Sequence, residues 1–340
     1  MNEIKNREGR GGVLARWLFA AAFILAVIFS GIFSGLVSTA GLFFLVVASV
    51  AVALMGFSRR EIGAAFRHAA GFGGSRGDLK HSAHFWAAAA RNVWILGVLG
   101  SAMNFTIALS GGSGGIAETS NRMIHSFIVV LYGLVLAVIC LIPAMKLAGL
   151  AEKAPEAGIP GGVPVQPLLF ERATGYVLFA AVLGLTVFSL TRGYPQDGPL
   201  PVARVMLHGP AILVVLGGAI ALALFMGAGA GARALTLGFA MTGLIGLLTG
   251  LIQALFGFVH TNIEEIAAAV AFIISASLFA LLGLVVIAAP LEDREVMEGR
   301  RERPGALSRM FWIVFPLLSF IFLLLTFIMV VTPMKKPGGA

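Results

Sequence analysis

One uncharged stretch constrains the fold of this chain more than any other. This stretch, Met123–Leu147, carries no charged side chain from Arg122 until Lys146. A helix of this length crosses the roughly 30 Å hydrocarbon core of a bilayer. Small and aromatic residues mix in its first half, and Pro143 lies near its end. We therefore expect a membrane helix that faces other protein on one side and lipid on the other.

The composition indicates an integral membrane protein, since only 12% of the residues are charged, against about a quarter in soluble domains. The net charge of +8 does not indicate nucleic-acid binding, because the basic residues lie in short segments between apolar runs, where membrane topology requires them. The single cysteine, Cys140, lies within an apolar run and has no partner for a disulfide or a cysteine-based metal site.

Hydropathy predicts about nine membrane spans. Most Lys and Arg residues fall on one side of these spans, which places the N-terminus in the cytoplasm and, with an odd number of spans, the C-terminus outside. The first run is too long for a signal-peptide core and is expected to remain as a span. The predicted spans are Val13–Leu36, Thr39–Phe57, Asn92–Leu109, Ile124–Met145, Gly175–Leu190, Gly209–Gly227, Ala234–Phe258, Ile266–Ala289 and Met310–Val331.

An internal repeat is indicated by two prolines, Pro143 and Pro290, which each end a long apolar run before a charged segment. The alternative is that apolar helices align by chance. The repeat predicts two parallel four-helix units, 1–150 and 173–300, with a cytoplasmic linker at 151–172 and a single span in 301–340. The corresponding positions are Tyr132 with Phe279, Gly133 with Ala280, and Gly97 and Gly100 with Gly243, Gly246 and Gly250.

Several segments resemble the MotA/TolQ/ExbB family of membrane proteins. The family's Leu-Tyr-Gly and Leu-Pro-hydrophobic-Ala segments are similar to Val130–Leu134 and Leu141–Leu147, its glycine-threonine span to Thr242–Gln253, and its short outer helix to Ile263–Ala267. The resemblance implies an oligomer, typically a pentamer, around the single spans of a MotB, TolR or ExbD partner. In the family, an aspartate of the partner carries protons, and proton flow drives mechanical work.

The ninth predicted span resembles the partner's span in the ExbD/TolR proteins, through Ile313–Phe320 and Phe327–Pro333. An ordinary anchor helix is the alternative. On the resemblance, Ser319 stands at the aspartate position, and serine does not ionise. The hydroxyl residues that would face this aspartate are replaced by Val129 and Val130 in the first unit, and the second unit keeps Ser277.

Other polar groups are candidates with a plain alternative. Hydroxyls and amides inside a membrane more often bond between helices than guide ions, and groups at the outer edge are either solvated or serve proton access. The channel-lining or packing candidates are Asn104, Val129, Val130, Tyr132, Gly133, Pro143, Thr249, Gln253, Ser277, Pro290 and Ser319. The outer-edge candidates are Glu118, His125, Glu264 and Glu265.

Cytoplasmic segments offer little chemistry by sequence. Ser58–Arg91 is expected to be helical and amphipathic, with His81 and His84 at its surface rather than on a metal. Glu292–Arg303 is expected to be a solvated helix end, and Trp312 an interfacial anchor. We expect no metal or cofactor, and no enzyme, because no nucleophile–base pair or pair of catalytic carboxylates is present.

The sequence therefore predicts an all-α, multi-pass protein of a bacterial inner membrane. It is expected to form a homo-oligomer within the lipid bilayer, with a possible single-span ExbD/TolR/MotB-like partner, as a subunit of a proton-channel or stator-type complex. A non-conducting structural paralogue and a secondary transporter built from parallel repeats are the alternatives. The transporter is less favoured, since no span shows a charged or unwound midplane site.

Overall fold

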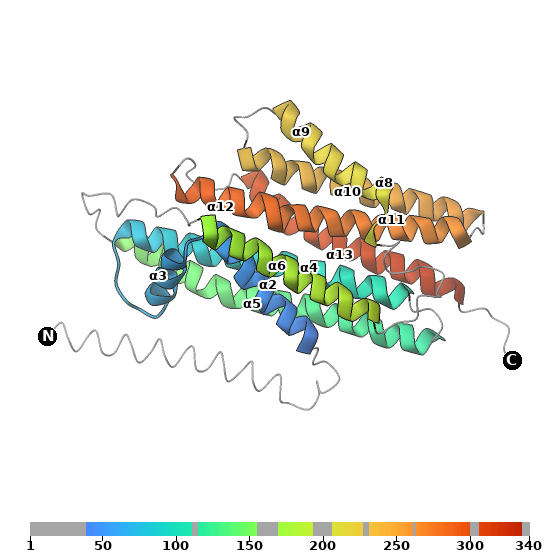
Figure 1. Ribbon diagram of the computed structural model, residues 1–340, viewed down its shortest axis with the longest axis horizontal. Coiled ribbons are helices and arrows are strands. Elements are labelled where there is room, and N and C mark those ends of the chain that lie inside the picture. Colours follow the sequence, from blue (N-terminus) through green and yellow to red (C-terminus); the bar gives the residue numbers. More distant parts are fainter. Residues whose placement is uncertain are drawn as a thin grey trace.

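The computed structural model describes residues 39–110, 115–154, 169–192, 206–226, 231–260, 263–299 and 306–334. Within these ranges every regular element is a helix, which confirms the predicted all-α class. The helices run side by side as an elongated bundle (Figure 1). The predicted first span, Val13–Leu36, lies outside the described residues.

The first four described helices belong mainly to the predicted first unit, and the fifth begins in the predicted linker and continues into the second unit. α2 bends by 115° into α3, and Ser58 caps the start of α3. Its hydroxyl accepts from the amide of Glu61 at 3.3 Å, and the Glu61 carboxylate accepts from the amide of Ser58 at 2.7 Å. Such a reciprocal cap satisfies two orphan donors. The helices are α2 (Thr39–Gly56), α3 (Arg59–Ala69), α4 (Arg76–Ser110), α5 (Gly115–Lys153) and α6 (Leu169–Arg192).

The remaining helices include two π-helical segments. One of them, Gly283–Ala288, ends two residues before Pro290. Proline lacks an amide donor and its ring crowds the preceding turn, and a widened turn accommodates both effects. The helices are α8 (Gly209–Ile212), the segment Leu213–Gly217, α9 (Gly218–Met226), α10 (Gly231–Val259), α11 (Ile263–Leu282), the segment Gly283–Ala288, α12 (Ala289–Met297) and α13 (Ala306–Met334).

Five described helical stretches are long and apolar enough to cross a membrane, as in a multi-pass membrane protein. The bent pair α2 and α3 makes a sixth if it counts as one span, and the apolar part of α13, Met310–Thr326, is shorter. The predicted span Asn92–Leu109 is the C-terminal half of α4. The five stretches are His125–Lys153, Phe170–Phe188, Gly209–Met226, Gly231–Val259 and Glu265–Met297.

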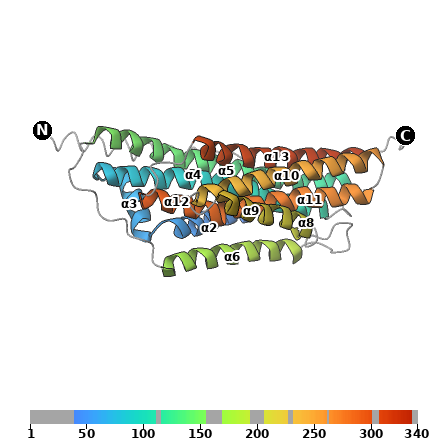
Figure 2. The same ribbon diagram turned by 90° about the horizontal axis from the view of Figure 1, so that it is seen from above.

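The span from Glu265 to Met297 lies at the centre of the bundle, since 78% of its apolar window is buried. By contrast, only 17% of the window in α6 is buried, and Figure 2 shows α6 along the outside. α6 packs mainly on α2. Gly175 makes this approach close, because a Cβ there would lie 2.8 Å from the Ala51 carbonyl oxygen.

Two helix pairs cross at small residues. A Cβ added to Gly97 of α4 would lie 2.9 Å from Cα of Gly133 in α5. Likewise, a Cβ added to Gly243 of α10 would lie 2.6 Å from Cβ of Ala280 in α11. Close approach of this kind is typical of membrane helix interfaces. The predicted alignment pairs Gly133 with Ala280, and Gly97 with the α10 glycines.

The next turn of each pair repeats the arrangement. A Cβ on Gly100 would lie 2.8 Å from Val129, and one on Gly246 would lie 2.7 Å from Ala276. The predicted alignment of the two prolines brings Val129 and Ala276 into register as well. The repeat and its domain boundaries stay predictions, with which these two pairs of contacts agree.

Candidate functional site

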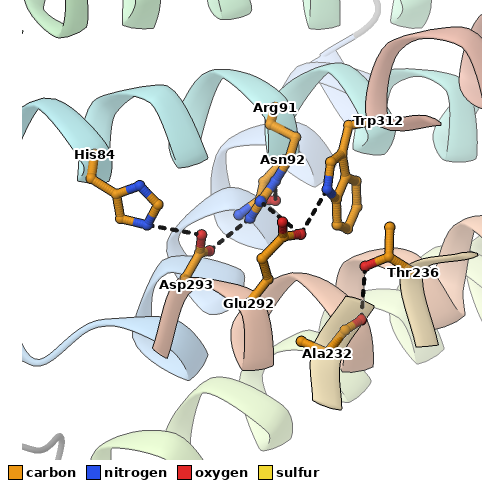
Figure 3. A network of polar contacts seen from close by, with 8 residues as sticks. All are labelled: His84, Arg91, Asn92, Ala232, Thr236, Glu292, Asp293 and Trp312. Atoms are coloured by element: carbon orange, nitrogen blue, oxygen red, sulfur yellow. Dashed lines mark hydrogen bonds and ion pairs between the residues drawn. The ribbon is translucent and has the colours of Figure 1, made fainter. Parts of the chain in front are cut away.

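A buried cluster of charged side chains joins three helices at the end of the bundle where α3 lies (Figures 1 and 3). We call it the charge cluster. Glu292 and Asp293 are 0% and 1% exposed, so the predicted solvated helix end is wrong for these two residues. The members of the charge cluster are His84, Arg91 and Asn92 of α4, Glu292 and Asp293 of α12, and Trp312 of α13.

Arg91 is the centre of the charge cluster. Its Nη2 lies 2.7 Å from Oδ2 of Asp293, and its Nη1 lies 3.8 Å from Oε2 of Glu292. Its Nε donates to Oδ1 of Asn92 at 3.2 Å. Hydrogen bonds between ionised groups are roughly twice as strong as neutral ones. One guanidinium thus holds Glu292 and Asp293 of α12 to α4.

Trp312 fixes Glu292 from the opposite side. The indole Nε1 donates to Oε2 of Glu292 at 2.7 Å. The ring also lies under the guanidinium of Arg91, 4.4 Å from its Cζ, which is a cation–π contact. The sequence reading of Trp312 as an interfacial anchor missed this role, in which one side chain ties α13 to both α4 and α12.

His84 contacts the other oxygen of Asp293. Its Nε2 lies 3.3 Å from Oδ1 of Asp293, and its side chain is 15% exposed. Neither atom makes a hydrogen bond in the described part of the chain. The prediction that His84 belongs to a plain surface is therefore wrong, because the side chain points into the charge cluster (Figure 3).

Close packing at two glycines and a side-chain cap hold α12 in this position. Pro290 and Gly56 lie against each other, with a Cβ on Gly56 only 3.5 Å from Cβ of Asp293 and 3.7 Å from Cα of Pro290. Glu295 of α12 accepts from the amide of Ala232 at 2.9 Å and so caps α10. A Cβ on Gly231, whose φ is +48°, would lie in the path of this carboxylate. Four helices thus converge on one short helix.

The electrostatics of the charge cluster make it a firm junction. Charges taken out of water carry a desolvation cost that only close, well-bonded partners offset. Here Asp293 has Arg91 at 2.7 Å, and Glu292 has both Arg91 and Trp312. Chemically, such a site can lock helices together and hold protons. In the described ranges, no group of three or more His, Cys, Asp or Glu residues is placed to hold a metal.

The positions that the family resemblance would direct at a partner's helix are buried within this chain. Val129 contacts Gly100 of α4, and Val130 is 5% exposed. Ser277 and Ser319 are fully buried, and their hydroxyls make no hydrogen bond among the described residues. Whether any of these residues lines a channel stays a prediction.

The other sequence candidates are scattered over the bundle. Gly133 packs on Gly97. Gln253 and Glu265 are exposed. The side chains of Glu118 and Glu264 lie outside the described residues. Pro143 and Pro290 are buried, and Asn104, His125, Tyr132 and Thr249 are half-buried.

Comparisons of the chain with protein families, with curated proteins and with solved structures found no match.

His81, one turn before His84, provides a pH-dependent test of the first turns of α4. Burial is the largest effect and lowers its pKa below the ordinary 6.5; Glu61 opposes this, the neighbouring His84 adds to it, and Asp78 opposes it least. Below pH 6.5 the unfolded chain therefore binds this proton more readily than the folded one, and the fold loses stability as the pH falls.

Replacing His81 with Gln is expected to reduce this loss. The measurement is thermal unfolding of the detergent-solubilised chain at pH 7.5, 6.5 and 5.5, for the wild type and H81Q. The gap between the two should move in favour of H81Q toward low pH. Parallel curves would contradict a buried, neutral His81.

Proposed function

We propose that this chain is a scaffold and channel-wall subunit of a MotA/TolQ/ExbB-like complex in a bacterial inner membrane, with its N-terminus in the cytoplasm. The observation that carries the proposal is the matched crossing of two helix pairs, with Gly97 against Gly133 and Gly243 against Ala280. This agreement supports two units of similar design, and the family-like segments Val130–Leu134 and Thr242–Gln253 each lie at one of the two crossings.

The position of α13 supports the second part of the proposal, in which this helix takes the place of a partner's span. A Cβ on Gly243 would lie 2.6 Å from the Phe315 ring, so α13 packs into the crossing of α10 and α11. Phe320 meets Phe127 of α5 edge to face, with the ring centroids 5.6 Å apart. α13 therefore contacts helices of both predicted units.

Ser319 limits the chemistry of this arrangement. It is buried in the bundle, and a serine hydroxyl does not release a proton at physiological pH. In a conducting complex, a separate single-span chain therefore supplies the titrating aspartate. Without such a chain, this protein is the non-conducting structural paralogue.

Purification from native membranes in mild detergent, followed by mass spectrometry and electron microscopy, tests the proposal. We expect a ring-like oligomer or a co-purifying single-span protein. Finding neither would contradict it. Proton flux into vesicles that contain this chain alone then separates the alternatives, since robust flux would rule out the structural paralogue.

The charge cluster favours a second candidate, the secondary transporter. It joins α4, in the predicted first unit, to α12 and α13, in the predicted second half, at one end of the bundle. Transporters built from parallel repeats rock their halves about a central site, and an ion pair between the halves would have to open in each cycle. Substrate-dependent uptake into vesicles is the expected result for this candidate.

A further inference from the structure

We propose that His84 and Asp293 form a proton-binding site that this chain carries itself. The proposal goes beyond the function above, in which the titrating group belongs to a separate partner. It rests on two buried atoms that face each other across α4 and α12, namely Nε2 of His84 and Oδ1 of Asp293, 3.3 Å apart.

The two atoms lack a hydrogen bond, and a proton on Nε2 of His84 supplies the missing donor. Oδ2 of Asp293 is bound by Arg91 at 2.7 Å, whereas Oδ1 makes no hydrogen bond in the described part of the chain, and neither does Nε2 of His84. A buried polar atom without a partner destabilises the fold. An imidazole with its proton on Nδ1 alone presents two facing acceptors here, whereas the other neutral tautomer and the imidazolium both have a donor on Nε2. Only the imidazolium adds a positive charge beside the buried carboxylate.

Exposure gives the direction of proton uptake. The His84 side chain is 15% exposed, whereas that of Asp293 is 1% exposed. Water therefore reaches the imidazole, and the carboxylate stabilises the charge from inside. The Phe57 ring lies 6.0 Å from the His84 ring, which covers part of it. Since His84 precedes the predicted span that begins at Asn92, uptake is from the cytoplasmic side.

Several of the charged groups around His84 and Asp293 have other partners. Arg91 opposes a second positive charge and Glu292 favours it. Among the described residues of α2, none between Gly41 and Gly56 titrates. The other charged or titratable groups on α3 are Arg59, which pairs with Glu171, Arg60, Glu61, which caps α3, Arg67, and His68, which contacts Ser82. Those on the first turns of α4 are Arg76, Asp78, which accepts from Ser75, Lys80 and His81. The neighbouring helices add Arg233 on α10, Arg294, which pairs with Glu298, and Glu295, which caps α10; the Arg309 side chain of α13 lies outside the described residues.

A proton on His84 therefore adds a second tie between α4 and α12, beside the one that Arg91 makes. The junction of these helices tightens when the cytoplasmic side becomes acidic, and loosens when the proton leaves. The charge cluster then acts as a proton-responsive contact between the two helices, whether or not a partner chain is present.

The test is nitrogen NMR of the full chain, labelled with ¹⁵N-histidine and placed in lipid nanodiscs, between pH 8 and pH 5. H84Q assigns the His84 signal by its loss. We expect His84 to become charged over this range in the wild type. In D293N its proton affinity should fall by about tenfold or more, because an opposite charge within 4–6 Å favours the charged form by that much.

Glu295→Gln is the matched control, since this carboxylate lies on the same helix but caps α10. It should leave the His84 titration unchanged. The wild-type spectrum decides the matter even if D293N does not fold, because an imidazole that stays neutral down to pH 5 overturns the proposal. A His84 titration that is the same in D293N as in the wild type overturns it as well. Both readouts use the chain without any partner, so they do not depend on the proposed complex.

Discussion

Replacing Arg91 with Gln is expected to destabilise the fold by about 3–5 kcal/mol, the cost of leaving a buried ion pair with one partner removed. Asp293 and Glu292 are 1% and 0% exposed, so water cannot replace the guanidinium that lies 2.7 Å from Asp293. The stack on Trp312 is lost at the same time. The measurement is the free energy of unfolding in mixed detergent and denaturant.

The double variant R91Q/D293N provides the control. It removes the unpaired carboxylate together with its partner, and replacing both members of a buried pair costs much less than replacing one. We therefore expect R91Q/D293N to be more stable than R91Q alone. Arg59→Gln is a second control. Arg59 is exposed, and its distance of 3.9 Å from its partner Glu171 is long for an ion pair. Ion pairs at the surface contribute about 0–1 kcal/mol. Equal losses in R91Q and R59Q would mean that the charge cluster does not hold the helices together.

The helices themselves could be predicted from the sequence, because a long uncharged apolar run has few other ways to fold in a membrane. The segment around Met123–Leu147 is indeed part of the long helix α5. The amphipathic pattern of Ser58–Arg91 likewise predicted α3 and the first turns of α4, and Phe85 and Trp86 are buried there. These are local patterns, and local patterns fix local structure.

The charge cluster could not be predicted in this way, because its partners lie far apart in the sequence. Arg91 and Asp293 are separated by 202 positions. Charged residues after an apolar run usually mark a solvated end, and nothing in the sequence near Glu292 and Asp293 shows that α2, α4 and α13 cover them. One signal was present. Two adjacent acidic residues follow Pro290 almost without a break from the apolar run, so a small shift of the helix places them in the bundle.

Replacing Gly133 with Val (G133V) is expected to destabilise the chain by about 1–3 kcal/mol or more, the range for overpacking a tight contact. A Cβ at Gly133 would lie 2.8 Å from Cα of Gly97 and 3.2 Å from the Val93 carbonyl oxygen. Both obstacles are backbone atoms, so no side chain can turn away, and α4 and α5 must separate. Unfolding in denaturant, with helix content followed by circular dichroism, measures the loss.

Gly149 supplies the matched control on the same helix, because a Cβ there would meet nothing within 4 Å. G149A should be neutral or more stable by up to about 1 kcal/mol, the gain of alanine over glycine in a helix. If the two units share one design, G243A should also be costly, since its Cβ would lie 2.6 Å from Ala280 and from the Phe315 ring. A harmless G133V, or a G243A that behaves as G149A does, would mean that these crossings are loose, and the main support for two similar units would be lost.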